Sequence, residues 1–268
     1  MTISILGCGW FGLPLAKSLT GQNFKVKGST TSAEKLATLE AAGITPFLID
    51  LSASEATYNP DFFVCDVLII AIPPKSRSRE GAEYVPKLER VIKAINKYGV
   101  KKVILISSTG VYADLNHEVD ESTPPQSYTP SSKILWEAEE LFGRQNDFKT
   151  TIIRFGGLIG PGREPGRFFA GKKNIPNGQA PVNMLHLDDC IGITTGIINK
   201  DAFGYTFNAC TPHHLPKSVF YTKAAAKAGL PVPEFIDELN EWKLINSIYV
   251  PPILGYTYKI SDWDDWLR

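Results

Sequence analysis

The chain begins with an apolar run that ends in three closely spaced glycines. Ile3–Leu6 predicts a short strand, and a Gly-x-Gly-x-x-Gly pattern then leads into a helical segment at Trp10–Leu19. In such a junction the first glycine allows a tight turn, the second lets a pyrophosphate approach the backbone, and the third lets helix and strand pack closely. The helix N-terminus would then face the phosphates with its N–H groups. The pattern predicts a dinucleotide site that includes Gly7, Gly9, Trp10, Phe11 and Gly12.

Strand-like and helical segments alternate over the first 155 residues. The run Val67–Ile72 is apolar throughout, as is typical of a strand buried on both faces of a parallel sheet. Gly43 and Gly99 follow helical segments, where a left-handed residue is favoured. The other predicted strands are Phe24–Lys27, Thr45–Ile49, Val103–Ser107 and Thr151–Arg154, and the other helices are Ala33–Ala42, Tyr84–Tyr98 and Pro130–Phe142. This order predicts an α/β fold with a Rossmann-type, doubly wound parallel sheet in residues 1–155.

Glycine and proline become frequent after Arg154, and helical patterns return at Cys190–Asn199, Lys217–Ala228 and Glu234–Trp242. Ligands of doubly wound sheets bind beyond the carboxyl ends of the strands. We therefore expect residues 156–268 to form a smaller C-terminal substrate lobe, interleaved with the first domain and not folding independently.

The overall charge argues against two classes of partner, nucleic acids and anionic membranes. Lys and Arg together number 28, as do Asp and Glu, so the chain has no electrostatic footprint for nucleic acid or for an anionic membrane. The longest apolar run is far shorter than the ~18 residues of a membrane span. Four cysteines without Cys-x-x-Cys spacing, and the absence of a secretory leader, predict reduced thiols and a cytoplasmic location.

The segment after the second predicted strand bears on the choice of dinucleotide. NAD sites usually have an acidic residue at the tip of this strand, whereas here the strand is expected to end by Gly28 and Glu34 to lie in the next helix. Hydroxyl groups and one ammonium suit a 2′-phosphate, although Ser32 could equally cap the helix. We expect NADP, with NAD as the alternative, bound by Ser29, Thr30, Thr31, Ser32 and Lys35.

Four segments, in order, resemble a known family. Leu105–Tyr112 (LISSTGVY) is similar to the strand-five signature of extended short-chain dehydrogenases/reductases, the NAD(P)-dependent epimerase/dehydratase group. Ser132–Glu137 (SKILWE) resembles the end of that family's Tyr-x-x-x-Lys helix. Arg154–Gly162 resembles the segment that borders the nicotinamide, and Asn183–Asp189 the segment that opens the substrate lobe. The chain most resembles an atypical bacterial branch described as nucleoside-diphosphate-sugar epimerases.

The resemblance implies roles for particular residues. Ser108 would hold the substrate oxygen, and Lys133 would bind the nicotinamide ribose and lower the pKa of a neighbouring acid–base group. Without the resemblance, Ser108 could simply end a strand and Lys133 could be a solvated lysine. The cofactor site would also include Ala71, Ile72, Pro73, Phe155 and Gly156.

The family's catalytic tyrosine is missing from its usual position. Thr129 lies four residues before Lys133, and Tyr128 precedes it, one helical step or about 100° away. Thr129-Pro130 also reads as a helix N-cap followed by a first-turn proline. The hydroxyl pKa of threonine is far too high for proton transfer near neutrality, whereas that of tyrosine starts at ~10. Either Tyr128 swings in, or Tyr112 or His186 acts instead, or the protein is a non-catalytic NAD(P) sensor.

Further residues bear on the substrate. The family's dehydratases have Asp-Glu where this chain has Thr109-Gly110, which argues against sugar 4,6-dehydration. Cationic and aromatic residues in the glycine-rich loop, Lys172 and Lys173 among them, suit a nucleotide-linked or other small anionic substrate, the alternative being a solvated loop. The candidates are Arg163, Arg167, Phe168 and His186. Adjacent His213 and His214 make a poor chelate, so no metal is expected. The resemblance also implies a homodimer through Tyr84–Tyr98 and Pro130–Phe142.

Overall fold

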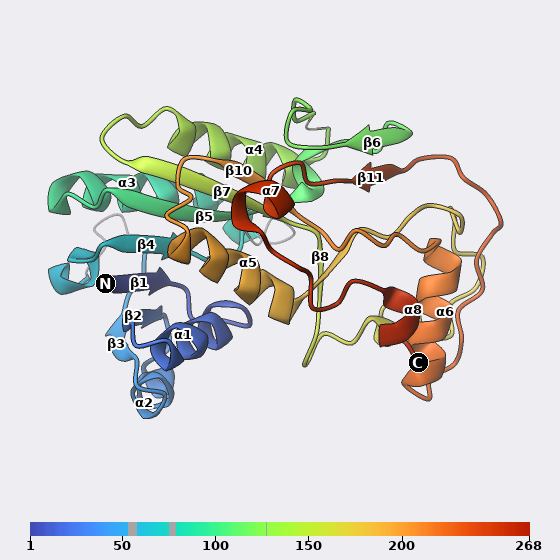
Figure 1. Ribbon diagram of the computed structural model, residues 1–268, viewed down its shortest axis with the longest axis horizontal. Helices are drawn as coiled ribbons and strands as arrows, with labels where there is room; N and C mark the ends of the chain where they lie inside the picture. The colour runs from blue at the N-terminus through green and yellow to red at the C-terminus, as the bar shows by residue number, and fades with distance from the viewer. Residues whose placement is uncertain (53–57, 75–78, 127) are drawn as a thin grey trace. The chain divides into compact units, whose positions relative to one another are not determined.

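The computed structural model describes residues 1–52, 58–74, 79–126 and 128–268, which form two compact units (Figure 1). Unit 1 comprises Met1–Val111, Ser127–Ile153 and Ile197–Thr206, and unit 2 comprises Tyr112–Gln126, Arg154–Gly196 and Phe207–Arg268. The chain passes from unit 1 to unit 2 after residue 153, close to the expected boundary at 155. Residues 112–126 also belong to unit 2 and residues 197–206 to unit 1, so the two units interleave along the chain.

A seven-stranded sheet, in the order β10-β7-β5-β4-β1-β2-β3, forms the centre of the fold. The pairs β1–β2, β1–β4, β2–β3 and β4–β5 are parallel. The strands are β1 (Thr2–Leu6), β2 (Lys25–Thr30), β3 (Thr45–Leu48), β4 (Val67–Ile70), β5 (Lys102–Ser108), β7 (Lys149–Phe155) and β10 (Thr206–Ala209). Helices flank the sheet, so the predicted Rossmann-type α/β fold is confirmed.

Alternation along the strands assigns side chains to the two faces of this sheet. Leu68 and Ile70 of β4 belong to a buried cluster that also contains residues of α3 (Tyr84–Tyr98) and α4 (Pro130–Gly143). Ile69, which lies between them in sequence, points to the other face. Ile5 of β1 lies on this opposite face, where α1 (Gly12–Gly21) contacts the strand. Burial on both faces explains why β4 is apolar throughout.

Several helix boundaries differ from prediction, among them the start of α5 (Leu187–Asn199), expected at Cys190. α1 begins at Gly12 instead of Trp10, and the helix expected at Ala33–Ala42 is a 3₁₀ turn, η1 (Ala33–Lys35), followed by α2 (Leu36–Ala41). The predicted left-handed residues after α2 and α3 are confirmed, since Gly43 has φ 73° and Gly99 has φ 71°.

The second strand is longer than expected. Ser29 and Thr30 pair with Phe47 and Leu48 of β3, so β2 continues to Thr30. The expectation that this strand ends by Gly28 is therefore wrong. Pairing with β3 extends the strand beyond the point where its local sequence turns polar.

Unit 2 contains two small parallel sheets, β6 (His117–Val119) with β11 (Lys243–Ile245) and β8 (Gly157–Ile159) with β9 (Met184–His186). Its other elements include η5 (Pro165–Arg167), α6 (Lys217–Lys227), α7 (Val250–Leu254) and α8 (Trp263–Trp266), while α5 (Leu187–Asn199) runs from unit 2 into unit 1. The prediction of a helix at Glu234–Trp242 is wrong. This segment instead forms backbone hydrogen bonds with another loop, and Ile236 N donates to Ile175 O at 2.8 Å.

Two general features bear on the setting of the protein. Among the helices of the described residues, none combines the length and the apolar character needed to cross a lipid bilayer. All four cysteines carry free thiols.

Candidate cofactor site

The three glycines after β1 meet three different steric demands. Gly7 has φ 104°, which only glycine adopts readily, and its N–H donates to Ser29 Oγ at 2.9 Å. A Cβ on Gly12 would lie 2.2 Å from Gly7 O, so this position admits no side chain. A Cβ on Gly9 would meet no described atom within 4 Å. The loop is therefore closed on the protein side and open on the side where a ligand can approach.

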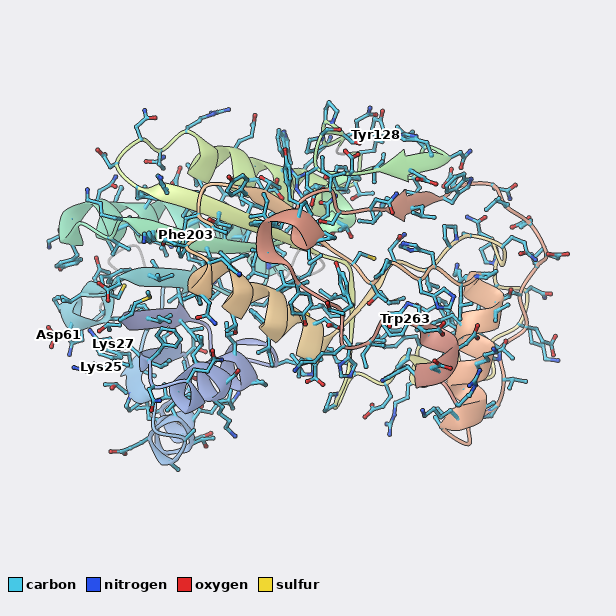
Figure 2. All side chains as sticks on the ribbon, in the orientation of Figure 1. Lys25, Lys27, Asp61, Tyr128, Phe203 and Trp263 are labelled. Carbon is cyan, nitrogen blue, oxygen red and sulfur yellow. The ribbon has the colours of Figure 1, made fainter. Side chains whose placement is uncertain are left out.

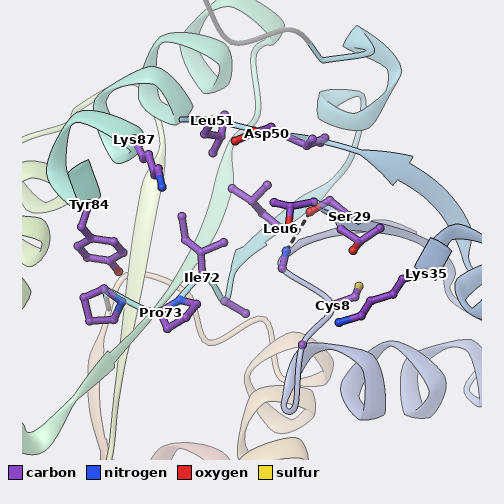
Figure 3. Close-up of a pocket in the computed structure, with 17 residues that line it drawn as sticks. Leu6, Cys8, Ser29, Lys35, Asp50, Leu51, Ile72, Pro73, Tyr84 and Lys87 are labelled. Carbon is purple, nitrogen blue, oxygen red and sulfur yellow. Dashed lines mark hydrogen bonds between the residues drawn. The ribbon is translucent and has the colours of Figure 1, made fainter. Parts of the chain in front are cut away.

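A pocket of about 240 Å³ opens beside this loop in unit 1 (Figure 3). It lies at the carboxyl ends of β1, β2, β3 and β4, where a doubly wound sheet binds its ligands. Of the residues predicted to bind cofactor, it is lined by Gly7, Gly9, Ser29, Thr30, Thr31, Lys35, Ala71, Ile72 and Pro73. The structure thus brings together residues up to 66 positions apart (73 less 7) in one cavity.

The remaining predicted cofactor residues do not line this pocket. Phe11 is the N-cap residue of α1 and is buried. Trp10 and Gly12 belong to the same turn without contributing to the cavity wall. Ser32 occupies the N-cap position of η1, but its side chain makes no capping hydrogen bond. The hydroxyl of Ser29 is already bound to Gly7 N, so its role is to hold β2 against the glycine loop.

Lys35 is the cation that the β2–α2 segment contributes to this pocket. Its side chain extends beside Cys8 at the glycine loop (Figure 3). Glu34 does not line the cavity and lies in η1, as expected from the sequence. Burial raises the pKa of the Cys8 thiol to about 12, so Cys8 is a neutral, packed side chain and not a thiolate.

Sequence reasoning missed two groups of lining residues. Asp50 and Leu51 come two and three residues after β3, and Arg90 Nη1 fixes this segment by donating to Leu51 O at 2.5 Å. Hydrogen bonds from Ser52 lower the pKa of Asp50, so its carboxylate is an ionised acceptor. Their position after a parallel strand was the signal available in the sequence. The other pocket residues missed are Leu6, Cys8, Ile49, Pro74, Tyr84 and Lys87.

Tyr84 and Lys87 lie three residues apart on α3 and present a phenol and an ammonium to the pocket. Tyr84 is buried, and burial, together with the negative charge of Glu139, raises its pKa. Glu139 of α4 is itself buried and accepts a hydrogen bond from Ser107 Oγ at 2.5 Å. A buried carboxylate therefore ties the end of β5 to α4, next to a wall of the pocket.

The predicted catalytic residues Ser108 and Lys133 belong to elements that contact each other. Ser108 ends β5, and its Oγ accepts from Gly110 N at 3.1 Å. A methyl group on Gly110 would lie within 4 Å of both Ser108 Oγ and Leu135 Cδ1, which places the strand end against the first turns of α4. Lys133 lies in the first turn of α4 and is exposed.

The structure assigns Thr129 a capping role. Its Oγ1 accepts from Ser132 N at 3.1 Å, and Ser132 Oγ accepts from Thr129 N at 3.0 Å, which completes a capping box for α4. Thr129 is therefore the N-cap of α4, the role that the Thr129-Pro130 pair predicts. Tyr128, labelled in Figure 2, precedes the helix with 69% of its surface exposed.

The two alternative acid–base residues lie in unit 2. Tyr112 is buried, its hydroxyl accepts from Arg154 Nη1 at 2.6 Å, and it also bonds to Asn208 Oδ1 at 3.0 Å. Burial raises the pKa of Tyr112, which disfavours proton release. His186 lines a different pocket, within unit 2.

Of the predicted substrate residues, His186 alone lines that second pocket. Arg163 and Arg167 are exposed, and Arg167 Nε lies 3.7 Å from the Glu164 carboxylate. Phe168 is 42% exposed, whereas its neighbour Phe169 packs against the unit 2 core. Among the other loop cations, Lys173 pairs with Glu234 at 2.8 Å and Lys172 lies over the Phe169 ring.

Phe155 and Gly156 belong to unit 2 and do not line the pocket beside the glycine loop. A Cβ on Gly156 would lie 2.8 Å from Asn183 O, so this glycine permits close packing. Asp189 is structural: it is buried and accepts from Tyr256 Oη, Lys259 N and Ile260 N.

Among the described residues, His213 comes together with Asp262 and Asp264. His213 Nδ1 is already the acceptor for Trp263 N at 3.0 Å, and Asp262 caps α8. These contacts account for the cluster, and the absence of a metal site stays a prediction.

The fold and the glycine loop thus define a Rossmann protein with a site built for a nicotinamide dinucleotide. The NAD(P)H-binding family matches residues 7–183. Protein YeeZ of Escherichia coli, from strain K12 and from O157:H7, is 34% identical over 266 residues, which cover 97% of this chain and 96% of the relative. The chain therefore belongs to the NAD(P)H-binding family, and its relationship to YeeZ confirms the branch that the sequence motifs indicate.

Solved structures share the same fold. A conserved protein of Silicibacter pomeroyi described as functionally unknown is 22% identical with TM-score 0.81, covering 99% of this chain and 96% of its own. MoeE5 in complex with UDP-glucose and NAD is 18% identical with TM-score 0.80, covering 98% and 95%. The UDP-glucuronic acid 4-epimerase of Bacillus cereus, in complex with UDP-glucuronic acid and NAD, is 16% identical with TM-score 0.79, covering 100% and 96%.

Proposed function

We propose that the protein is an NADP-preferring oxidoreductase of the epimerase/dehydratase type that acts on a small anionic, nucleotide-sugar-like substrate. The observation that carries the proposal is the glycine loop, in which Gly7 and Gly12 are required sterically while Gly9 faces open space beside a pocket. The fold itself does not require a glycine at position 9. A ligand that must approach the backbone closely would explain why this residue has no side chain.

The chemistry of the pocket suits each part of a dinucleotide. Its apolar walls after β3 and β4 accept a flat adenine ring, and the Asp50 carboxylate can accept from the exocyclic amino group. The pyrophosphate would lie over Gly9 at the N-terminus of α1, whose first turn carries no acidic residue.

The preference for NADP rests on the tip of β2. Thr30, Thr31 and Lys35 line the pocket there, and this segment offers no carboxylate to the ribose hydroxyls. Lys35 provides a positive charge for a 2′-phosphate. The carboxylate that does line the pocket, Asp50, follows β3 instead. NAD, which the MoeE5 and UDP-glucuronic acid 4-epimerase structures contain, is the alternative cofactor.

The redox chemistry would be that of the bound nicotinamide, while the chain binds, orients and moves a proton. Ser108 would hold the substrate oxygen and Lys133 the nicotinamide ribose. Tyr128 would be the proton donor and acceptor, which requires it to turn from its exposed position toward Ser108 when ligands bind.

A second function, that of a non-catalytic NAD(P) sensor, is favoured by one observation. The residue four before Lys133 is a threonine whose hydroxyl is occupied in the capping box. With this position closed to proton transfer, the fold could bind the dinucleotide without turning it over.

Enzyme and sensor can be distinguished by measuring binding and turnover separately. Calorimetry gives the Kd of NADPH and NADH, and nicotinamide absorbance follows turnover with a panel of nucleotide sugars and aldehydes. For an enzyme, Lys133→Met abolishes turnover while Lys17→Met, a change of an exposed lysine on α1, leaves it intact. Tight cofactor binding without turnover on any substrate supports the sensor.

Two outcomes would overturn these assignments. Unaltered turnover in Tyr128→Phe rejects the displaced tyrosine, and failure to bind NADPH and NADH at millimolar concentration rejects the cofactor. A cytoplasmic location and a homodimer through α3 and α4 stay predictions, the second testable by sedimentation.

A further inference from the structure

Unit 2 contains a second pocket, of about 360 Å³. Backbone and small side chains of Gly160, Pro161, Pro165 and Gly166 form one part of it. Gly166 packs closely against α6, since a Cβ at this position would lie 2.4 Å from Ala224 O. Apart from Glu164, this stretch lines the pocket with glycines and prolines only, whose small side chains leave room for a planar ring.

The indole of Trp266 forms another part of the wall, and its neighbours hold it in place. The fully buried Trp263 ring, labelled in Figure 2, meets it edge-on with centroids 5.7 Å apart. Lys227 Nζ lies 5.5 Å from the Trp266 ring centroid and donates to Trp266 O at 2.5 Å. A preordered indole loses little conformational freedom when a second ring packs against it.

His186 contributes a hydrogen-bond donor to the same pocket. Its side chain is 11% exposed, and its Nδ1 accepts from Asp188 N at 3.2 Å. In a neutral imidazole this arrangement places the proton on Nε2. Nε2 faces the pocket wall, 3.4 Å from where a Cβ on Gly160 would lie, and has no hydrogen-bond partner among the described residues. A donor that opens on a pocket in this way can be paired by an acceptor on a bound ligand.

The charges around the pocket favour an acceptor with negative character. Lys227 is positive, while Glu164 accepts from Gly162 N at 3.2 Å and lies 3.7 Å from Arg167 Nε, so its charge is already engaged. Asp188 Oδ2, 3.7 Å from His186 Nδ1, lies at the other ring nitrogen.

We infer that unit 2 binds, in this pocket, a planar ring bearing a carbonyl or carboxylate oxygen, which stacks on Trp266 and accepts from His186 Nε2–H. A pyrimidine base of a nucleotide and a free aromatic acid both have this chemistry. The inference does not rest on the cofactor proposal, because every residue that carries it belongs to unit 2.

The test is a titration of the whole chain with uridine 5′-monophosphate, benzoate and the non-planar cyclohexanecarboxylate. It is run with and without saturating NADPH, which keeps nucleotides out of the unit 1 pocket. The readout is the side-chain ¹⁵N NMR spectrum of the four histidines, with Kd measured by calorimetry. The Nε2 signal of His186, assigned with His186→Gln, is expected to shift on binding, while that of exposed His117 stays in place.

Variants then test the ring contact. Trp266→Leu is expected to weaken binding at least tenfold, and Trp242→Leu, which lies outside the pocket, to leave it unchanged. A shift with uridine 5′-monophosphate alone identifies a base as the ligand, and one with benzoate alone identifies an aromatic acid. The inference is overturned if neither probe shifts His186 in the wild-type protein, or if cyclohexanecarboxylate binds as tightly as benzoate. Failure of NADPH to bind would count against the proposed function only.

Discussion

Replacing each of two glycines in the first loop by alanine should separate folding from cofactor binding. At Gly12 the new Cβ would lie 2.2 Å from Gly7 O and 3.3 Å from Ile5 Cγ2, so either the helix or the strand must move. Overpacking of this kind costs about 1–3 kcal/mol, and the higher helix propensity of alanine returns less than about 1 kcal/mol. At about 2–4 °C per kcal/mol, Gly12→Ala should melt several degrees below the wild type.

At Gly9 the same substitution meets no described atom within 4 Å, and φ at this position is not positive. The fold therefore accepts alanine, with a gain of up to about 1 kcal/mol from the reduced entropy of the unfolded chain. The methyl group would occupy the space into which the pyrophosphate must fit. Gly9→Ala should thus melt at or above the wild-type temperature and bind NADPH at least tenfold more weakly.

The assays are differential scanning calorimetry of the free protein and isothermal titration with NADPH. Gly21→Ala is a suitable control, because its Cβ also meets no described atom within 4 Å and Gly21 lies outside the pocket. Wild-type affinity in Gly9→Ala would show that no pyrophosphate lies over this residue. Wild-type stability in Gly12→Ala would refute the steric reasoning.

Three more predictions concern single side chains. Lys35→Met should weaken NADPH about tenfold, or ~1.4 kcal/mol, with NADH unchanged, and equal losses for both would reject the 2′-phosphate contact. Tyr112→Phe removes a partner of buried Arg154 and should lower the free energy of unfolding by about 1–3 kcal/mol in denaturant titrations, against almost nothing for Tyr98→Phe. Burial lowers the pKa of His214 below its ordinary 6.5, so the unfolded chain binds more protons and stability falls as the pH drops below about 6.5. His214→Gln should flatten this slope and His117→Gln should not; an unchanged slope in His214→Gln would contradict the assignment.

The local sequence determined those features that depend on backbone sterics and on periodicity. The apolar run of β4, the left-handed glycines after α2 and α3, and the cap and first-turn proline of α4 are all present as predicted. Each follows from residues a few positions apart, because φ/ψ preference and side-chain capping act over one or two turns.

Only the tertiary structure decided which residues share a pocket. Asp50, Tyr84 and Lys87 carry no motif, and they reach the glycine loop because parallel strands end together and α3 packs over them. The extension of β2 to Thr30 likewise depends on β3, and the irregular path of residues 234–242 depends on hydrogen bonds to a distant loop. The same holds for His186 and Trp266, which are 80 positions apart (266 less 186) and line one cavity in unit 2. Contacts over such separations depend on how the elements pack, which local patterns do not encode.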